Sequence, residues 1–154
     1  GDEGGGYALG RMALAAVGRA LDGRGIRTSL SEELLQATGT ADLDALVAWA
    51  QTADRAAVAA LARPASAAAQ RGDPIARQLV DATAADLVAL VIGLLRQFPA
   101  GAPDQLALAG SLLGDGTPVR LSLVSSINRA APHLRIETNP PDPALGAARL
   151  ATQA

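Results

Sequence analysis

Apolar residues recur at three- and four-residue intervals through most of the chain, the spacing that buries one face of a helix. The first such stripe predicts a helix over residues 7–22. Two shorter stripes predict helices over 29–39 and 42–51. The first of these begins with Ser29 and Glu32 in a capping-box pattern, in which the two side chains satisfy free backbone N–H groups reciprocally.

The helical pattern continues over 54–71, where Pro64 either kinks the helix or opens a new segment, since proline lacks a backbone N–H. The longest predicted helix follows, over about 74–97. Asp73 is its expected cap, and Pro74 occupies the first helical position. Toward its end this helix is apolar on more than one face, which predicts a central helix that is well covered by others.

The pattern changes in the last third of the chain. A short apolar run at 106–109, flanked by turn residues, predicts a buried strand of a parallel sheet. A turn over 110–116, a helix over 117–131 and a second strand over 133–137 follow, and a last helix is predicted over 144–151. This order predicts an α/β fold dominated by helices.

The length of 154 residues is that of one domain, so we expect a single domain over 1–154. Two short strands make a poor sheet by themselves. The chain also opens on Gly1 within a glycine-rich loop. We therefore expect a piece of a longer protein, with further strands ahead of Gly1.

Composition narrows the classes of function. The net charge of −2 argues against electrostatically driven binding to nucleic acid or to an anionic membrane. The chain has no Cys and a single His, which excludes iron–sulfur chemistry within it and disfavours zinc. No uncharged apolar run approaches about 18 residues, so no membrane span is predicted and a cytoplasmic location is expected.

Two adjacent carboxylates, Asp2 and Glu3, stand among glycines directly before the first predicted helix. Acidic residues at a helix start complement its positive end, which is one interpretation. The other is a ligand site, because glycine lets the backbone approach a ligand and a carboxylate accepts hydrogen bonds from sugar hydroxyls. The residues alone leave both interpretations open.

Gly110 follows the first predicted strand, and ligands of open α/β sheets bind at the carboxyl ends of strands. Without a side chain there, a flat base or a ribose can lie against the backbone, although an ordinary turn explains the same pattern. Gly72-Asp73-Pro74 is interpreted as a helix stop followed by a helix start. The lone His133 is a poor catalytic candidate.

These motifs, in this order, resemble the BadF/BadG/BcrA/BcrD ATPase family, which includes N-acetylglucosamine and glucosamine kinases. The matching pieces are Gly-Asp-Glu-Gly with the helix through Leu9-Gly10-Arg11, then Gly72-Asp73-Pro74, then 106–113, then 140–148. The resemblance covers nearly the whole chain. Gly-Asp-Glu-Gly at the head of a helix is its most specific part.

The resemblance implies a fold of the actin-like, sugar-kinase and heat-shock ATPase superfamily, whose members have two ribonuclease-H-like lobes. The chain would be most of the C-terminal lobe without its first strands. The family's phosphate loops and catalytic Asp lie in the other lobe, so no catalytic residue is expected here. Residues 1–154 alone are expected to have no kinase activity, since phosphoryl transfer requires all parts in line.

The resemblance also implies the ligands: an amino sugar, either N-acetylglucosamine or glucosamine, and ATP with Mg²⁺. Asp2 would contact sugar hydroxyls, Gly110, Ser111 and Gly114 would pack on adenosine, and Val58 would border the adenine. Many members have two glycines where this chain has Gly110-Ser111. A homodimer is a further expectation.

Two other functions stay open. One is the ATPase activator of a radical dehydratase or reductase, which the same family contains. Such activators hold an iron–sulfur cluster through Cys, and this chain has none. The other is a non-catalytic regulator that retains only sugar binding.

Overall fold

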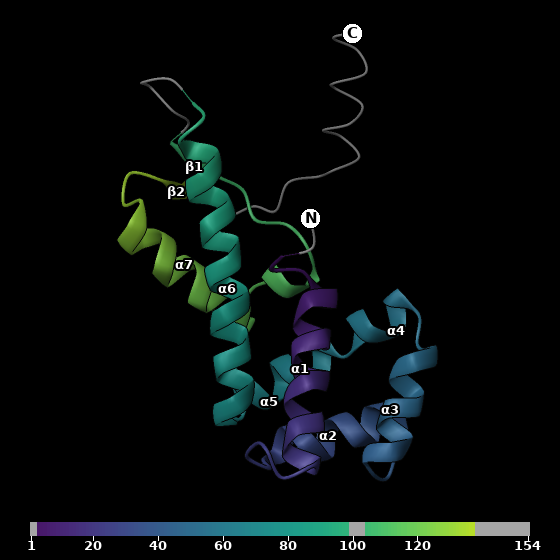
Figure 1. Cartoon of the computed structure of the whole chain (residues 1–154). Helices are drawn as coiled ribbons and strands as arrows, with labels where there is room; N and C mark the ends of the chain where they lie inside the picture. The colour runs from purple at the N-terminus through teal and green to yellow at the C-terminus, as the bar shows by residue number, and fades with distance from the viewer. Residues whose placement is uncertain (1–2, 99–103, 138–154) are drawn as a thin grey trace, which may run out of the picture.

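The computed structural model describes residues 3–98 and 104–137. Seven α-helices, a short 3-10 helix and two strands occur in these ranges (Figure 1). In chain order they are α1 (Gly6–Leu21), α2 (Ser29–Thr38), α3 (Leu43–Thr52), α4 (Arg55–Ala60), α5 (Ala62–Gln70), α6 (Pro74–Leu95), β1 (Gln105–Leu106), the 3-10 helix η1 (Ser111–Leu113), α7 (Pro118–Ala130) and β2 (Arg135–Ile136). The predicted loop residue Asp2 and the predicted last helix over 144–151 lie outside the described residues.

The larger apolar cluster lies where α1, α2, α5 and the start of α6 meet. The predicted stripe of α1 supplies Leu9, Ala13 and Val17, each at most 1% exposed. Helix α5 supplies alanines, of which Ala65 and Ala68 are fully buried. Small side chains let helices approach closely, so a chain poor in aromatic residues still fills this core.

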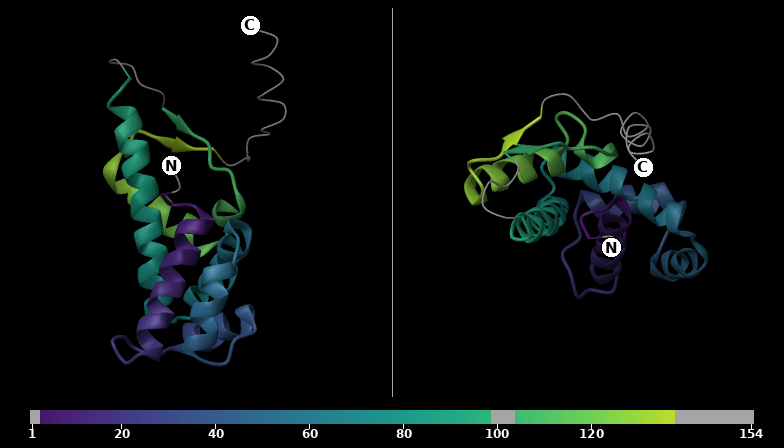
Figure 2. Two further views of the ribbon diagram at one scale, coloured as in Figure 1. Left: turned by 45° about the vertical axis from the view of Figure 1, so that its right-hand side comes forward. Right: turned by 90° about the horizontal axis from the view of Figure 1, so that it is seen from above.

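A second apolar cluster joins α6, α7 and the strands. Strands β1 and β2 pair in parallel, with Leu106 opposite Ile136, and α7 makes the connection between them (Figure 2). The helix-rich α/β fold and the parallel pairing confirm the prediction. The strands are shorter than predicted, although Leu108, beyond the end of β1, is still buried at 6% exposure.

Asp73 caps two helices at once. Its carboxylate accepts the Ala76 N–H at the start of α6 (2.9 Å) and, with its other oxygen, the Leu30 N–H (2.9 Å) and the Ser29 hydroxyl (2.8 Å) of α2. Burial raises the pKa of Asp73, but the hydrogen bonds from Ala76, Leu30, Thr28 and Ser29 outweigh it and lower the pKa to about 2.

This arrangement corrects the expected capping box. Thr28 is the residue before α2 and makes no side-chain cap, while Ser29 lies inside the helix and donates to Asp73. The predicted role of Asp73 as the cap of α6, with Pro74 in the first position, is confirmed.

The predicted break near Pro64 is confirmed but begins earlier, at Leu61 between α4 and α5. Pro64 stands in the first turn of α5, where backbone N–H groups have no partner inside the helix. Pro64 therefore opens the helix without costing it a hydrogen bond.

The expectation that α6 is well covered is wrong for its second half. Leu90 is 53% exposed and Leu94 is 56% exposed. By length and composition alone, α6 could cross a membrane: it has 22 residues and a window of mean hydropathy 1.8, of which 17% is buried. This is weak evidence, because Asp81 and Asp86 fall within the helix and an Asp at a bilayer centre costs about 3 kcal/mol.

Candidate functional site

The turn after β1 is fixed to the start of α7 by hydrogen bonds. The Thr117 hydroxyl donates to the carbonyls of Leu112 (2.6 Å) and Gly114 (2.9 Å), and Thr117 also caps α7. Arg120, from the first turn of α7, donates to the Leu113 carbonyl at 3.0 Å. These contacts hold the backbone of the turn in one conformation.

Gly110 opens this turn with φ +113° and ψ 158°, a conformation that other residues rarely adopt. A Cβ at Gly110 would meet nothing within 4 Å, so this stretch of backbone faces open space. A flat ligand can therefore approach the Gly110 backbone directly.

A cavity of about 100 Å³ lies against the turn. Gly110, Gly114 and Leu113 line it together with Asp115 and Arg120, whose side chains form an ion pair at 3.4 Å. The cavity thus offers an apolar wall, bare backbone and two charged groups with hydrogen-bonding capacity. It is smaller than a whole nucleotide and fits one edge of a base or ribose.

The structure brings some of the predicted adenosine residues together. Gly110 and Gly114 line the same cavity, and Ser111 lies between them as the first residue of η1 without lining it. Val58 lines a different cavity, between α1, α3 and α4, and its side chain is 7% exposed. Asp2 is outside the described residues.

The described part of the Gly-Asp-Glu-Gly loop packs against α6. Gly4 is buried, with φ +74°, and a Cβ there would lie 2.4 Å from Leu87 Cδ2 and 3.3 Å from the Thr83 carbonyl oxygen. Only glycine fits both the conformation and the space. Figures 1 and 2 both show the start of α1 beside η1, so this loop and the Gly110 turn lie at the same end of the helical cluster.

Sequence reasoning missed Asp115 and Arg120 as cavity residues. Arginine side chains are mostly exposed in folded proteins, yet the Arg120 side chain is 17% exposed. The available indication was the position of Arg120 in the first turn of a helix that follows a glycine-rich turn.

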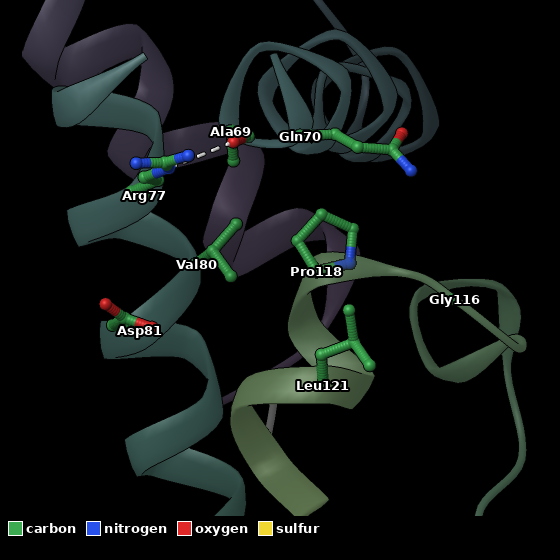
Figure 3. A pocket seen from close by; sticks show the side chains of 8 residues that line it. All are labelled: Ala69, Gln70, Arg77, Val80, Asp81, Gly116, Pro118 and Leu121. Carbon is green, nitrogen blue, oxygen red and sulfur yellow. Dashed lines mark hydrogen bonds between the residues drawn. The ribbon is translucent and has the colours of Figure 1, made fainter. Parts of the chain in front are cut away.

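A larger cavity of about 350 Å³ lies between α5, α6 and α7, away from the predicted residues (Figure 3). Val80, Pro118 and Leu121 give it an apolar centre. Arg77 at its edge donates to the Ala69 carbonyl at 3.4 Å, and Asp81 accepts from the Ser122 hydroxyl at 2.7 Å. Its charged groups are thus engaged within the fold.

In the part of the chain that the structure describes, no three His, Cys, Asp or Glu residues gather in a way that could hold a metal ion.

In open α/β folds, ligands bind beyond the carboxyl ends of the parallel strands, and the Gly110 turn follows such a strand here. The chain belongs to the BadF/BadG/BcrA/BcrD ATPase family, whose sequence profile matches residues 1–151. This confirms the resemblance found in the sequence.

Among solved structures the chain is similar to the "Putative N-acetylglucosamine Kinase" from Chromobacterium violaceum, with 31% identity and a TM-score of 0.72. The match covers 91% of this chain and 45% of that protein, so the chain spans less than half the length of this relative. No curated protein matches the chain.

Proposed function

We propose that this chain supplies part of the adenosine site and part of the sugar site of an ATP-dependent amino-sugar kinase. The observation that carries the proposal is the rigid turn at Gly110, whose backbone faces open space at the end of a parallel strand. Membership of an ATPase family and the likeness to the Chromobacterium protein support it.

In the proposed site, adenosine lies on the backbone of Gly110 to Gly114, and Ser111 is small enough to be tolerated beside it. Arg120 and Asp115 border the cavity and would hydrogen-bond the base or the ribose. Val58 would border the adenine only if the nucleotide extended beyond this cavity, since Val58 lines another.

The Gly-Asp-Glu-Gly loop is proposed to bind the sugar, with Asp2 accepting hydrogen bonds from its hydroxyl groups. Gly4 packs against Leu87 of α6 and so fixes the position of the loop beside that helix. The proposed substrates are N-acetylglucosamine or glucosamine.

The proposed reaction transfers the γ-phosphoryl group of ATP to a sugar hydroxyl and releases ADP, with Mg²⁺ neutralising charge on the phosphates. The groups that bind the phosphates and remove the hydroxyl proton are proposed to lie in a second lobe outside these residues. The 154-residue chain alone is therefore expected to bind nucleotide weakly and to transfer no phosphate to either sugar.

Nucleotide binding tests the proposal with a matched pair of variants. Gly110 and Gly116 both have positive φ (+113° and +74°), and a Cβ at either meets nothing within 4 Å, but only Gly110 lines the proposed adenosine cavity. Both G110A and G116A therefore impose backbone strain, of about 1–2 kcal/mol. Only G110A places a methyl group where the base would lie.

We expect calorimetric titration with ADP to show binding to the wild-type chain and to G116A, and a loss of about tenfold or more in affinity for G110A. Equal affinities in all three proteins would remove Gly110 from the site. A coupled ADP-release assay with each sugar completes the test. Sugar-dependent turnover by the 154-residue chain alone would contradict the proposed division between two lobes.

A further inference from the structure

The cavity between α5, α6 and α7 has a mixed lining that the proposed kinase sites do not use (Figure 3). Its volume of about 350 Å³ is within the range of small-molecule pockets. Val80, Pro118 and Leu121 form an apolar wall, and Leu121 is 62% exposed. Arg77 and Asp81, both on α6, belong to the same lining. The cavity therefore combines an apolar surface with one positive and one negative charge.

Arg77 and Asp81 lie one turn apart on α6 without forming an ion pair. Side chains four residues apart on a helix are neighbours, and opposite charges at this spacing attract. Among the residues that the structure describes, however, neither side chain has an ion-pair partner. The Arg77 Nε–H donates instead to the Ala69 carbonyl of α5 at 3.4 Å, as Figure 3 shows. Asp81 Oδ1 accepts the Ser122 hydroxyl of α7 at 2.7 Å.

Both charged groups keep hydrogen-bonding capacity beyond these two bonds. A guanidinium group carries five N–H donors, and Arg77 uses only its Nε–H toward the described residues. The second carboxylate oxygen of Asp81, Oδ2, accepts no hydrogen bond from the described residues. Both side chains are exposed, so a ligand can reach them from solvent. Each is thus held in place by a neighbouring helix while its remaining donors or acceptor stay available.

The two opposite charges limit the class of ligand. A simple carboxylate would be attracted by Arg77 but repelled by Asp81, and a simple amine would meet the reverse. A zwitterion satisfies both charges at once. In an α-amino acid the carboxylate and the ammonium group are attached to the same carbon atom, so one small molecule can bridge side chains whose Cβ atoms are about 5–6 Å apart. The apolar wall favours an aliphatic side chain on that molecule.

We propose that this cavity binds a free α-amino acid with an aliphatic side chain. The carboxylate of the amino acid accepts hydrogen bonds from the terminal nitrogens of Arg77, and its ammonium group donates to Asp81 Oδ2. Its side chain lies against Val80, Pro118 and Leu121, where removal of apolar surface from water adds to the affinity. This site is independent of the proposed kinase function.

NMR titration of the 154-residue chain with leucine tests the proposal. The Nε–H resonance of Arg77 and the methyl resonances of Val80 and Leu121 are expected to shift and saturate together. Arg63, an exposed arginine of α5 that does not line the cavity, is the internal control. Isocaproate is leucine without the ammonium group, and isoamylamine is leucine without the carboxylate. Each is expected to bind about fivefold more weakly than leucine, since one charged contact is lost.

Charge-removing variants identify the two contacts separately. D81N removes the attraction for the ammonium group together with the repulsion of isocaproate, so this variant is expected to bind leucine and isocaproate equally. R77Q is expected to bind leucine and isoamylamine equally for the corresponding reason. R63Q on α5 and D86N on α6 remove charges outside the cavity and are expected to keep the wild-type preferences. All four positions are exposed, and circular dichroism checks that each variant remains folded.

A response to leucine that does not saturate would overturn the inference, as would equal affinities of the wild type for leucine, isocaproate and isoamylamine. Glycine binding as tightly as leucine would also overturn it, because the apolar wall would then take no part. The same holds if R63Q and D86N lose the preferences as R77Q and D81N do, since the effect would then come from net charge. Failure of ADP to bind at Gly110 would sink the proposed kinase function and leave this site standing.

Discussion

At the residue scale, Asp73 shows how one carboxylate can hold two helices. The Gly72-Asp73-Pro74 pattern predicted its role as the cap of α6, because Asp before Pro is a typical helix start. Its second role, at the start of α2, depends on a contact between residues 43 positions apart, Leu30 and Asp73. No local pattern contains such a contact, so the same sequence reasoning assigned Ser29 to a capping box instead.

The pKa of Asp73 makes this contact sensitive to acid. The folded protein lowers the pKa from 3.8 to about 2. The stabilisation is therefore fully present above pH 3.8 and is lost as pH falls toward 2. A shift of this size corresponds to about 2.5 kcal/mol of unfolding free energy.

We expect D73N to lower the free energy of unfolding at pH 7 by about 2 kcal/mol, because an amide cannot accept as many strong bonds to backbone N–H groups. D42N is the matched control, since Asp42 caps only α3 and is exposed. Urea unfolding measures both. A loss in D73N no greater than in D42N, or an unchanged slope of stability between pH 2 and 4 in D73N, would contradict this role.

At the element scale, the sequence identified every described α-helix within a few residues, because apolar stripes, caps and prolines are local features. It could not show what covers each face. The apolar surface of α6 led to an expectation of burial, yet Leu90 and Leu94 are more than half exposed. Hydrophobic periodicity shows which side of a helix is apolar. Whether that side is buried depends on which other elements pack against it.

The crossing of α1 and α4 is the element contact that tolerates least change. G10A is expected to destabilise the protein by about 1–3 kcal/mol although alanine is the better helix former, because its Cβ would collide with the Val58 carbonyl. G18A, in the same helix with nothing within 4 Å of its Cβ, is expected to stabilise by about 0.5–1 kcal/mol.

Thermal unfolding distinguishes the two variants by the sign of the change in Tm. Opposite signs support a backbone contact at Gly10. A rise in Tm for both would show that α4 can move away from α1 without loss.

At the scale of the whole molecule, an apolar surface remains exposed along the second half of α6. Leu90, Leu94 and Phe98 are 53%, 56% and 44% exposed. Exposed leucines contribute little to folding but favour association. The double variant L90S/L94S is therefore expected to change the free energy of unfolding by less than about 0.5 kcal/mol while reducing the binding of a hydrophobic dye.

Leu87 provides the control for this surface, because it packs against both apolar clusters and against Gly4. L87S is expected to destabilise by about 2–3 kcal/mol. Chemical unfolding and dye fluorescence measure the two effects separately. Comparable destabilisation by L90S/L94S and by L87S would show that the exposed leucines belong to the core.

The contact between Leu30 and Asp73 also closes the chain into a loop. The start of α2 and the start of α6 are joined by this contact, and helices α2 to α5 form the loop that it closes. The position of the first residue of α6 is therefore held by the contact as well as by the connections within the loop. Extra residues at the exposed Ala41, between α2 and α3, would add little to the entropy cost of closing this loop, since each doubling of a loop's length costs about 0.6 kcal/mol. The connection between α2 and α3 can therefore lengthen or accept an inserted tag. Helix α6, whose Leu87 packs against Gly4, is expected to stay in place.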